Sequence, residues 1–426
     1  MSGSAQGGAA MHRVARTATA VIAASTALAV VTACGGSSGT EVAADAEQTL
    51  TVWAMGAEGE KLAEVAKEYE KENPHLKVKV TPVGWDVAHQ KLVSAAAAGN
   101  LPDIAQMGGS YLGEFAELGV LEPVDTKRFQ EKDFFPAGWQ QGEVDGEVYG
   151  VPWYVDTRVL YYRTDLAEKA GVDKAPADWK ELRALASAYQ KDAGTKWGLS
   201  IQPSGLDTVQ SFYPFLYSAG GEIIDEDGKV VVDSPAAVKA LKEYGAYFDK
   251  GLANKSVPPG YDVVKDFGNG RVPMFFGGPW HVTLLNEGQP DIKGKWAVAE
   301  VPADEASVSM AGGSSLTVSK DSPHKAAAEE FIAHLTSTEG QADWYERTKD
   351  LPANTTAWES GSLADDPALK VFEKQMKTAK ASPTLANLSE ITDKVDQAIA
   401  QVTQGKATAE EALGKAKDQI EGLVQK

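Results

Sequence analysis

The sequence predicts an α/β fold, because segments with strand character alternate with segments of helical character along its 426 residues. Short runs rich in apolar and β-branched residues are followed by stretches whose apolar residues recur three and four positions apart. This alternation occurs before Gly150 and resumes after it, and the chain is longer than one ordinary domain requires. We therefore expect two or three folding units built on largely parallel sheets.

The first unit is predicted to alternate three strands with two helices. The strands are expected at residues 50–54, 78–82 and 101–107, and Pro74 ends the helix between the first two. Asp86 can cap the helix that leads to the third strand. The apolar residues expected to face inward on these helices are Leu62, Val65, Ala66, Tyr69, Ala88, Leu92, Ala95 and Ala96.

The second half of the chain continues the same pattern. Strands are expected at residues 159–162 and 296–301, with helices at 178–190 and 235–250. A further strand at 314–319 precedes a helix, and the C-terminal residues predict two more helices. The apolar faces of these last three helices are Ala328, Phe331, Ile332 and Leu335; Ile391, Val395, Ile399 and Val402; and Leu413, Ala416, Ile420 and Leu423.

The N-terminal residues have the three parts of a secretory signal peptide: a basic stretch, an apolar run over 18–31, and small residues before a cut. The tetrapeptide that ends in Cys34, the one cysteine of the chain, resembles the lipobox of bacterial lipoproteins. The alternatives are a buried thiol or an ordinary signal peptide. We expect a lipoprotein signal peptide over 1–33, a lipid-modified Cys34 and a flexible linker over 34–47. The protein would then be anchored at the extracytoplasmic face of a bacterial cell membrane.

The composition argues against several classes of protein. A formal net charge of −19 argues against nucleic-acid binding, which needs a basic surface. One cysteine excludes an intramolecular disulfide, and beyond the leader no apolar stretch approaches the roughly 20 residues of a membrane helix. The six histidines lack metal-ligand spacing, and the nucleophile-elbow, P-loop and dinucleotide motifs are absent. We expect no metal, no cofactor and no enzymatic activity, although counting cannot exclude a catalytic pair of carboxylates.

Aromatic residues are abundant in segments expected to be loops. A flat ring can stack on the apolar face of a sugar, while neighbouring polar groups bind its hydroxyls, and a buried polyol needs both. For each single aromatic residue, packing in the core is the alternative. The residues concerned are Trp85, Tyr111, Trp139, Trp153, Tyr154, Tyr213, Tyr217, Trp280, Trp344 and Trp358.

Four pairs of segments stand out in the chain: 95–104 with 115–123, 148–156 with 160–162, 267–274 with 278–280, and 311–315 with 326–336. Together they resemble the extracellular solute-binding proteins of carbohydrate ABC importers. The segments follow the family's order and cover the chain from about residue 48 onward. Pro273 departs from the pattern, since alanine is usual at that position.

The resemblance implies a two-lobe fold of the periplasmic-binding-protein type, in which each lobe is a mainly parallel sheet flanked by helices. Hinge segments near 153–157, 306–311 and 345–352 would join the lobes. The N-terminal lobe would comprise 48–154 and 310–346, and the C-terminal lobe 155–309 and 347–426. A carbohydrate held between the lobes would favour the closed form, which would dock as a monomer on the permease subunits of an ABC transporter with a cytoplasmic ATPase.

The matching motifs also indicate binding residues. Asp156 is expected to accept hydrogen bonds from sugar hydroxyls and Trp280 to stack on the ring. Gly312 and Gly313 would let backbone amides approach the ligand, and Arg347 would supply a fork of donors. The alternatives are that the glycines form only a hinge turn and that Arg347 pairs with a surface acid. The full set is Glu58, Trp85, Asp86, Ser110, Tyr111, Tyr154, Asp156, Tyr213, Trp280, Gly312, Gly313 and Arg347.

The sequence therefore favours a substrate-binding lipoprotein of a carbohydrate ABC importer. The number of aromatic residues favours a di- or oligosaccharide, but the sequence does not identify the sugar. A surface glycoside hydrolase is one alternative, because aromatic residues with carboxylates also describe its cleft. A receptor for a non-sugar solute or for a sensor kinase is another.

Overall fold

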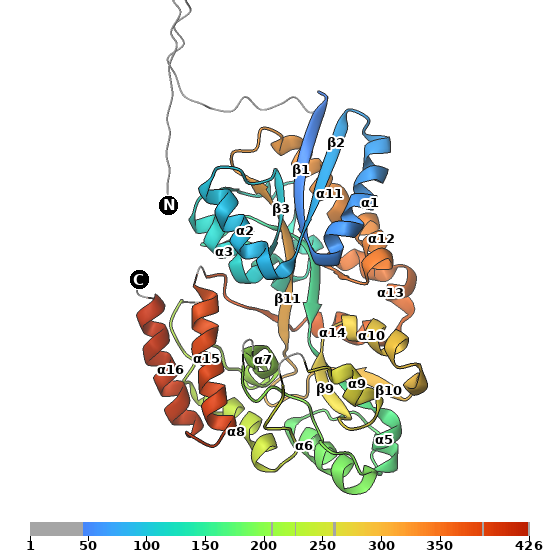
Figure 1. Cartoon of the computed structure of the whole chain (residues 1–426), viewed down its shortest axis with the longest axis vertical. Coiled ribbons are helices and arrows are strands. Elements are labelled where there is room, and N and C mark those ends of the chain that lie inside the picture. The colour runs from blue at the N-terminus through green and yellow to red at the C-terminus, as the bar shows by residue number, and fades with distance from the viewer. Residues whose placement is uncertain (1–45, 206–207, 226, 259–260, 386, 425–426) are drawn as a thin grey trace, which may run out of the picture. The chain divides into compact units, whose positions relative to one another are not determined.

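The N-terminal strands lie side by side in the larger of the main sheets (Figure 1). β1 pairs in parallel with β2 on one side and with β3 on the other. Helices α1 and α2 connect these strands and bury most of their predicted apolar faces. The elements are β1 (Gln48–Met55), α1 (Gly56–Glu72), β2 (Leu76–Val83), α2 (Trp85–Ala97) and β3 (Ile104–Gly108). The computed structural model describes residues 46–205, 208–225, 227–258, 261–385 and 387–424, so the predicted leader and Cys34 lie outside the described residues.

The start of α2 differs from the prediction. The helix begins at Trp85, and Gly84 with its extended backbone takes the cap position. Asp86 therefore lies in the first turn, exposed, where the positive end of the helix dipole favours a carboxylate. Among the described residues no side chain caps this helix, so the prediction that Asp86 does so is wrong.

The strand β11 lies in the middle of the larger sheet and connects its two halves. It pairs antiparallel with β3 on one side and with β7 on the other. The order of strands is β12, β7, β11, β3, β1, β2, and the short strands β4 and β13 also pair with β11. The new elements are β4 (Leu121–Glu122), β7 (Val151–Thr157), β11 (Met310–Ser319), β12 (Leu351–Pro352) and β13 (Lys380–Ala381).

The smaller sheet confirms the predicted strands but not their direction. β8 (Val159–Arg163) lies between β10 (Trp296–Ala299) and β9 (Met274–Gly277), and both neighbours run antiparallel to it. The helix α10 (Trp280–Gly288) connects β9 to β10, and β8 fills the place between them. The expectation of a mainly parallel second sheet is wrong, because β8 enters directly from β7 and inserts between two strands that run the other way.

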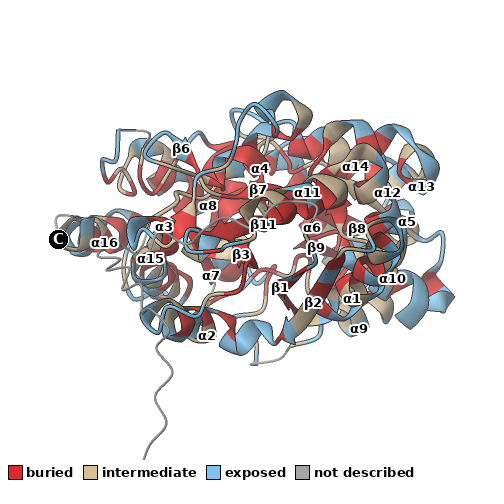
Figure 2. Ribbon diagram, turned by 90° about the horizontal axis from the view of Figure 1, so that it is seen from above, coloured by how far each residue is buried: buried red, intermediate tan, exposed pale blue. Residues whose placement is uncertain are grey.

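The buried residues follow the strands and the inner faces of the helices (Figure 2). One apolar core joins residues of both sheets, including Trp153 on β7, Tyr161 on β8 and Phe275 on β9. Trp153 packs on Trp344 with ring centroids 4.5 Å apart. For Trp139, Trp153, Trp344 and Trp358, all at most 4 % exposed, the alternative of core packing holds.

A C-terminal helical hairpin packs on the helices of the second half of the chain. α15 and α16 lie against each other and against α8, and α15 also contacts α7. Together these helices bury a second apolar core that includes Phe212, Tyr244, Ile399 and Leu413. The new elements are α7 (Thr208–Ser218), α8 (Pro235–Asp249), α15 (Leu388–Thr403) and α16 (Ala409–Val424).

The remaining helices cover the sheets from several sides (Figure 1). They are α3 (Gly109–Glu117), α4 (Pro136–Gln140), α5 (Thr164–Lys169), α6 (Trp179–Ala188), α9 (Val263–Gly268), α11 (Lys325–Thr336), α12 (Thr338–Thr348), α13 (Gly361–Asp365) and α14 (Pro367–Met376). A short hairpin pairs β5 (Glu143–Val144) with β6 (Glu147–Val148).

Among all helices of the described ranges, none combines the length and the apolar character that crossing a membrane requires.

Candidate functional site

Two cavities of the described structure share Asp156, at the point where the chain passes from the larger sheet to the smaller one. The smaller cavity has a volume of about 410 Å³ and is lined by Glu58, Tyr154, Trp280 and residues 348–351, among others. The larger cavity has a volume of about 620 Å³ and is lined by residues of α2, α3, α7, β11 and α15. The smaller cavity therefore combines residues of the larger sheet with residues of α10, the helix that follows β9 of the smaller sheet.

The structure brings together most of the residues that the sequence singles out. Ten of the twelve predicted binding residues, all within the described part of the chain, line one or both cavities. Several follow the carboxyl ends of β1, β2 and β3, where ligands of open α/β sheets bind. The ten are Glu58, Trp85, Ser110, Tyr111, Tyr154, Asp156, Tyr213, Trp280, Gly312 and Gly313.

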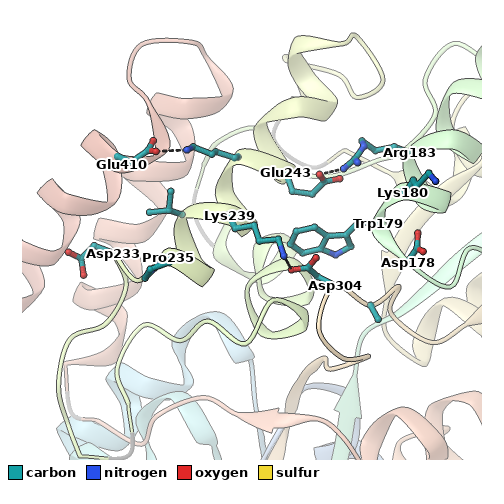
Figure 3. Close-up of a pocket in the computed structure, with 13 residues that line it drawn as sticks. Asp178, Trp179, Lys180, Arg183, Asp233, Pro235, Lys239, Glu243, Asp304 and Glu410 are labelled. Atoms are coloured by element: carbon teal, nitrogen blue, oxygen red, sulfur yellow. Dashed lines mark hydrogen bonds and ion pairs between the residues drawn. The ribbon is translucent and has the colours of Figure 1, made fainter.

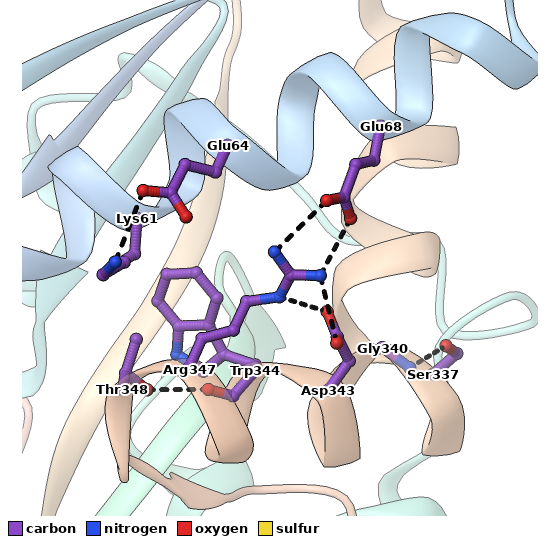
Figure 4. A network of polar contacts seen from close by, with 9 residues as sticks. All are labelled: Lys61, Glu64, Glu68, Ser337, Gly340, Asp343, Trp344, Arg347 and Thr348. Atoms are coloured by element: carbon purple, nitrogen blue, oxygen red, sulfur yellow. Dashed lines mark hydrogen bonds and ion pairs between the residues drawn. The ribbon is translucent and has the colours of Figure 1, made fainter.

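Asp86 and Arg347 are the two predicted residues that, in the described structure, line neither cavity. Arg347 lies on α12 and connects it to α1 (Figure 4). Its Nε atom lies 2.6 Å from Asp343 Oδ2, and its Nη2 atom lies 2.8 Å from Glu68 Oε2. The guanidinium thus pairs with surface acids, as the alternative interpretation had it.

A chain of hydrogen bonds holds Glu58 at the smaller cavity. Tyr154 Oη donates to Glu58 Oε1 at 3.0 Å, and Gln106 Nε2 donates to Tyr154 Oη at 3.4 Å. Gln106 is itself fixed, because its Oε1 accepts from the amide of Met55 at 2.6 Å. Burial, followed by the negative charge of Glu58, raises the pKa of Tyr154 well above its usual value. Tyr154 therefore remains a neutral donor that orients the Glu58 carboxylate.

Asp350 is a carboxylate of the smaller cavity that the sequence prediction missed. Its Oδ2 accepts a hydrogen bond from Trp344 Nε1 at 3.1 Å. Burial and the negative charge of Glu58 raise the pKa of Asp350 to about 7. The preceding residue, Lys349, ends α12 with a positive φ of 66°, and this turn brings Asp350 to the cavity. The predicted hinge segment 345–352 includes residue 350, but the sequence motifs indicate only Arg347 of this segment as a binding residue.

Arg158 contacts both Trp280 and Asp156 and is a second residue that the sequence prediction missed. Trp280 is the first residue of α10 and is 43 % exposed. The Arg158 guanidinium lies 4.8 Å from the centroid of its ring, a cation–π arrangement. Arg158 Nη1 also lies 2.5 Å from Asp156 Oδ1. The sequence signal is the position of Arg158 two residues after Asp156, between the matching segments 148–156 and 160–162.

The larger cavity contains polar atoms without partners. Tyr111 Oη and Gln210 Oε1 are buried and have no hydrogen-bond partner among the residues that the structure describes. Both residues line this cavity, as do Ser389 and Thr392 at the start of α15. A ligand hydroxyl can satisfy such atoms, since a buried polar group left unpaired costs about 1–3 kcal/mol. Gln210, Ser389 and Thr392 carry no motif that marks them in the sequence.

A wider groove of about 970 Å³ lies on α6 and α8 and shares no residue with the two cavities (Figure 3). Six of its charged side chains form three ion pairs within the groove. Lys239 lies 2.5 Å from Asp304, Arg183 pairs with Glu243, and Lys242 pairs with Glu410. Because these charges neutralise one another and no predicted binding residue lines the groove, we assign the candidate site to the two cavities that share Asp156.

The candidate site contains no metal centre. Within the described ranges, no three His, Cys, Asp or Glu side chains are grouped closely enough to hold a metal ion. The chemistry that the site offers is hydrogen bonding by carboxylates, hydroxyls and one guanidinium, together with exposed aromatic rings.

The sequence matches the family described as bacterial extracellular solute-binding protein over residues 64–371, which is more than half of the chain. The chain belongs to this family. The names of the following relatives also describe binding proteins or a receptor.

Three relatives illustrate what this solute-binding protein is similar to. The maltodextrin-binding protein of Bacillus subtilis is 26% identical, over 92% of this chain and 93% of that protein. The structure of the sugar-binding protein MalE from Xanthomonas citri is 32% identical with a TM-score of 0.82, and the match covers 89% of this chain and 98% of that one. A receptor of Streptomyces glaucescens, solved unliganded and in complex with acarbose, is 28% identical with a TM-score of 0.76, covering 88% and 98%.

The likeness to these structures confirms the predicted two-lobe α/β class. It does not test the individual binding residues, which stay predictions for this solute-binding protein. It also does not test the predicted lobe boundaries. Those boundaries place β12 and β13 in the C-terminal lobe, whereas both strands pair within the larger sheet.

Proposed function

We propose that this solute-binding protein captures a di- or oligosaccharide and delivers it to the permease of a carbohydrate ABC importer. The observation that carries the proposal is the convergence of ten predicted sugar-binding residues, carried by two strands of the larger sheet and by several helices, on two adjoining cavities. The sugar-binding relatives support the same ligand class. The volumes of about 410 and 620 Å³ fall in the usual range of roughly 300–1,000 Å³ for small-molecule sites.

The residues of the cavities suit a polyhydroxylated ligand. Trp85 and Trp280, each 43 % exposed, offer ring faces for the apolar side of a sugar. Glu58, Asp156 and Asp350 offer acceptors for hydroxyl donors. A site built from such groups rejects a ligand that lacks the matching hydroxyls, because its own polar groups would then be left unpaired.

The two adjoining cavities favour a ligand of more than one ring. One sugar unit near Trp280 in the smaller cavity and the next near Trp85 in the larger would both lie within reach of Asp156, which lines both. A ligand that contacts groups from both sheets favours the arrangement in which those groups are closest. We propose that the segments near 153–157, 306–311 and 345–352 act as the hinge, and that the closed form, as a monomer, docks on the permease.

We further propose that a lipid on Cys34 holds the protein at the extracytoplasmic face of the membrane. Cys34→Ser should move the protein from the detergent phase to the aqueous phase in a detergent partition experiment. Equal partitioning of both proteins would exclude the lipid.

A thermal-shift screen over mono-, di- and trisaccharides tests the ligand class. A ligand that binds only the folded protein adds about 2.7 kcal/mol of stability at a concentration of 100 times Kd, so the correct sugar raises Tm in a concentration-dependent manner. The proposal would be wrong if amino acids or peptides raised Tm and no sugar did. Analysis of the same mixtures for cleaved sugar separates a receptor from a glycoside hydrolase.

A further inference from the structure

Arg158 lies at the junction of the two main sheets. It follows Thr157, the last residue of β7, and precedes Val159, the first residue of β8. The backbone around it is held by the segment 306–311. Ser309 Oγ donates to the Arg158 carbonyl at 2.8 Å, and Thr157 Oγ1 donates to the Met310 carbonyl at 2.6 Å. Only the side chain of Arg158 is therefore free to change partners.

The Arg158 side chain contacts the two groups that the proposed function gives to the sugar. Its Nη1 atom is 2.5 Å from Asp156 Oδ1, and its guanidinium is 4.8 Å from the centroid of Trp280. The benzene part of the Trp280 ring packs on Gly278, where an added Cβ would lie only 2.2 Å from Trp280 Cζ3. The Trp280 ring is thus flanked by Gly278 and by the guanidinium, although its indole remains 43 % exposed.

We propose that Arg158 takes the place of a sugar ring in the empty site, and that the ligand must displace its guanidinium from Trp280 and Asp156. This inference rests on the proposed function. A guanidinium pairs with a carboxylate and stacks on an indole, so it occupies the two groups that a sugar would contact through its hydroxyls and its apolar face. In the empty site the protein itself therefore supplies partners for Trp280 and Asp156.

The larger cavity offers the displaced guanidinium a new position. Arg158 already lines this cavity, and so does Gln210, whose buried Oε1 has no donor among the described residues. A guanidinium carries five N–H donors and no acceptor, so it suits this oxygen. Displacement moves the Arg158 side chain from Trp280 and Asp156 to Gln210. Only a ligand that contacts both Trp280 and Asp156 can therefore bind.

Removal of Arg158 should therefore tighten sugar binding. A self-contact that competes with the ligand lowers the apparent affinity by the fraction of protein that is not competent to bind. We expect Arg158→Ala to lower the Kd of the sugar found by the thermal-shift screen about three- to tenfold, measured by calorimetry on the full chain. Arg158→Lys, which keeps the cation, should stay closer to the wild type. Arg271→Ala, which removes an exposed arginine paired with Asp266, should leave the Kd unchanged.

A double-mutant cycle connects the effect to Trp280. The gain from Arg158→Ala should become smaller when Trp280 is replaced by alanine, because only the contact of Arg158 with Asp156 then competes with the sugar. A Kd that rises in Arg158→Ala would overturn the proposal, because Arg158 would then be a donor to the sugar. A gain of undiminished size without Trp280 would overturn it as well.

Quenching of tryptophan fluorescence, measured without sugar, tests the contact between Arg158 and Trp280 independently of the proposed function. Arg158→Ala should increase the quenching of tryptophan fluorescence by acrylamide, and the increase should be absent in a Trp280→Phe background. Equal quenching in the presence and absence of Arg158 would show that the guanidinium does not cover the ring in solution. If no sugar binds the wild type, the proposed function fails, and the quenching result still stands by itself.

Discussion

Trp280 and Asp156 are the residues on which the binding proposal depends most. Trp280 begins a helix that follows a strand of the smaller sheet, whereas Asp156 lies on a strand of the larger sheet. Both line the smaller cavity, and Asp156 lines the larger one too. A ligand that contacts both side chains bridges the two sheets.

We expect Trp280→Ala to weaken sugar binding by at least tenfold, which corresponds to about 1.4 kcal/mol. The reason is the loss of the stacking surface, and the exposed position of the side chain means that the fold should not suffer. Calorimetry measures the affinity, and circular dichroism checks the fold. The matched control is Trp197→Ala, at a half-buried tryptophan that lines neither cavity of the described structure. Unchanged affinity in Trp280→Ala would exclude the stacking role.

Asp350 should make the stability of the protein depend on pH. Its pKa is about 7 in the folded protein, well above that of an exposed carboxyl near 4, so folding favours the protonated form. This contribution is present below about pH 4 and is lost as the pH rises through about 7. Asp350→Asn cannot ionise, so we expect it to remove a loss on the order of 2–4 kcal/mol over this range.

Chemical denaturation of the wild type and of Asp350→Asn at several pH values between 4 and 7 measures this effect. The exposed Asp321 provides the control, since Asp321→Asn should leave the pH dependence as it is. Parallel pH profiles for the wild type and Asp350→Asn would show that Asp350 ionises as a solvent-exposed group does.

The binding residues that could be predicted are those that stand in motifs. Trp280 and Asp156 were found because their neighbours in the sequence resemble a known family. Arg158 lies between two of the matching segments and Asp350 in the predicted hinge segment 345–352, but their positions at the site depend on a left-handed turn at Lys349 and on the distance to a tryptophan. Gln210 could not be found, because only the packing of α7 brings it to a cavity with the residues of α3.

At the scale of elements, the close pairing of β7 with β11 shapes the floor of the site. Gly313 on β11 has a φ of 134°, and a Cβ there would lie 2.3 Å from the carbonyl oxygen of Tyr154. The register of the two strands shifts directly after it, between Ser314 and Ser315. A glycine is therefore required for the strands to approach each other at this point.

Gly313→Ala should destabilise the protein by more than about 2 kcal/mol, because the added methyl group meets backbone and the conformation is strained. Gly414→Ala is the matched control. Gly414 lies inside α16 with no atom within 4 Å of its Cβ position, so alanine there should stabilise the helix by up to about 1 kcal/mol. Denaturation of both variants measures the two effects. A tolerated alanine at position 313 would show that the strands can separate without cost.

Most of the elements were predictable, as was the parallel pairing of β1 with β2 and β3, but the strand directions in the smaller sheet were not. Residues 178–190 and 235–250 become α6 and α8, and the strand expected at 314–319 is the second half of β11. Hydrophobic periodicity identifies the type of element because it reflects burial of one face or both. It carries no information on the neighbouring strand, so the antiparallel pairing of β8 with β9 and β10 could not be derived from it.

At the scale of the whole molecule, the chain joins an acidic body to a predicted lipid anchor. A net charge of −19 gives the chain no electrostatic attraction to anionic lipid, so attachment to a membrane would depend on the proposed anchor. The larger and smaller sheets are joined by β7 and β8 at the place where the two cavities meet. Ligand capture and any change in the angle between the sheets would thus involve the same few residues.

The two cavities that share Asp156 are proposed to bind a sugar of more than one ring. Calorimetric titration of the full chain with glucose, maltose and longer maltooligosaccharides tests it most directly. We expect saturable binding of one sugar per protein, tighter for a di- or oligosaccharide than for glucose, weakened by Trp280→Ala and with no sugar cleaved. Absence of binding across di- and oligosaccharides of different linkages, or binding that is unchanged in Trp280→Ala, would contradict the account.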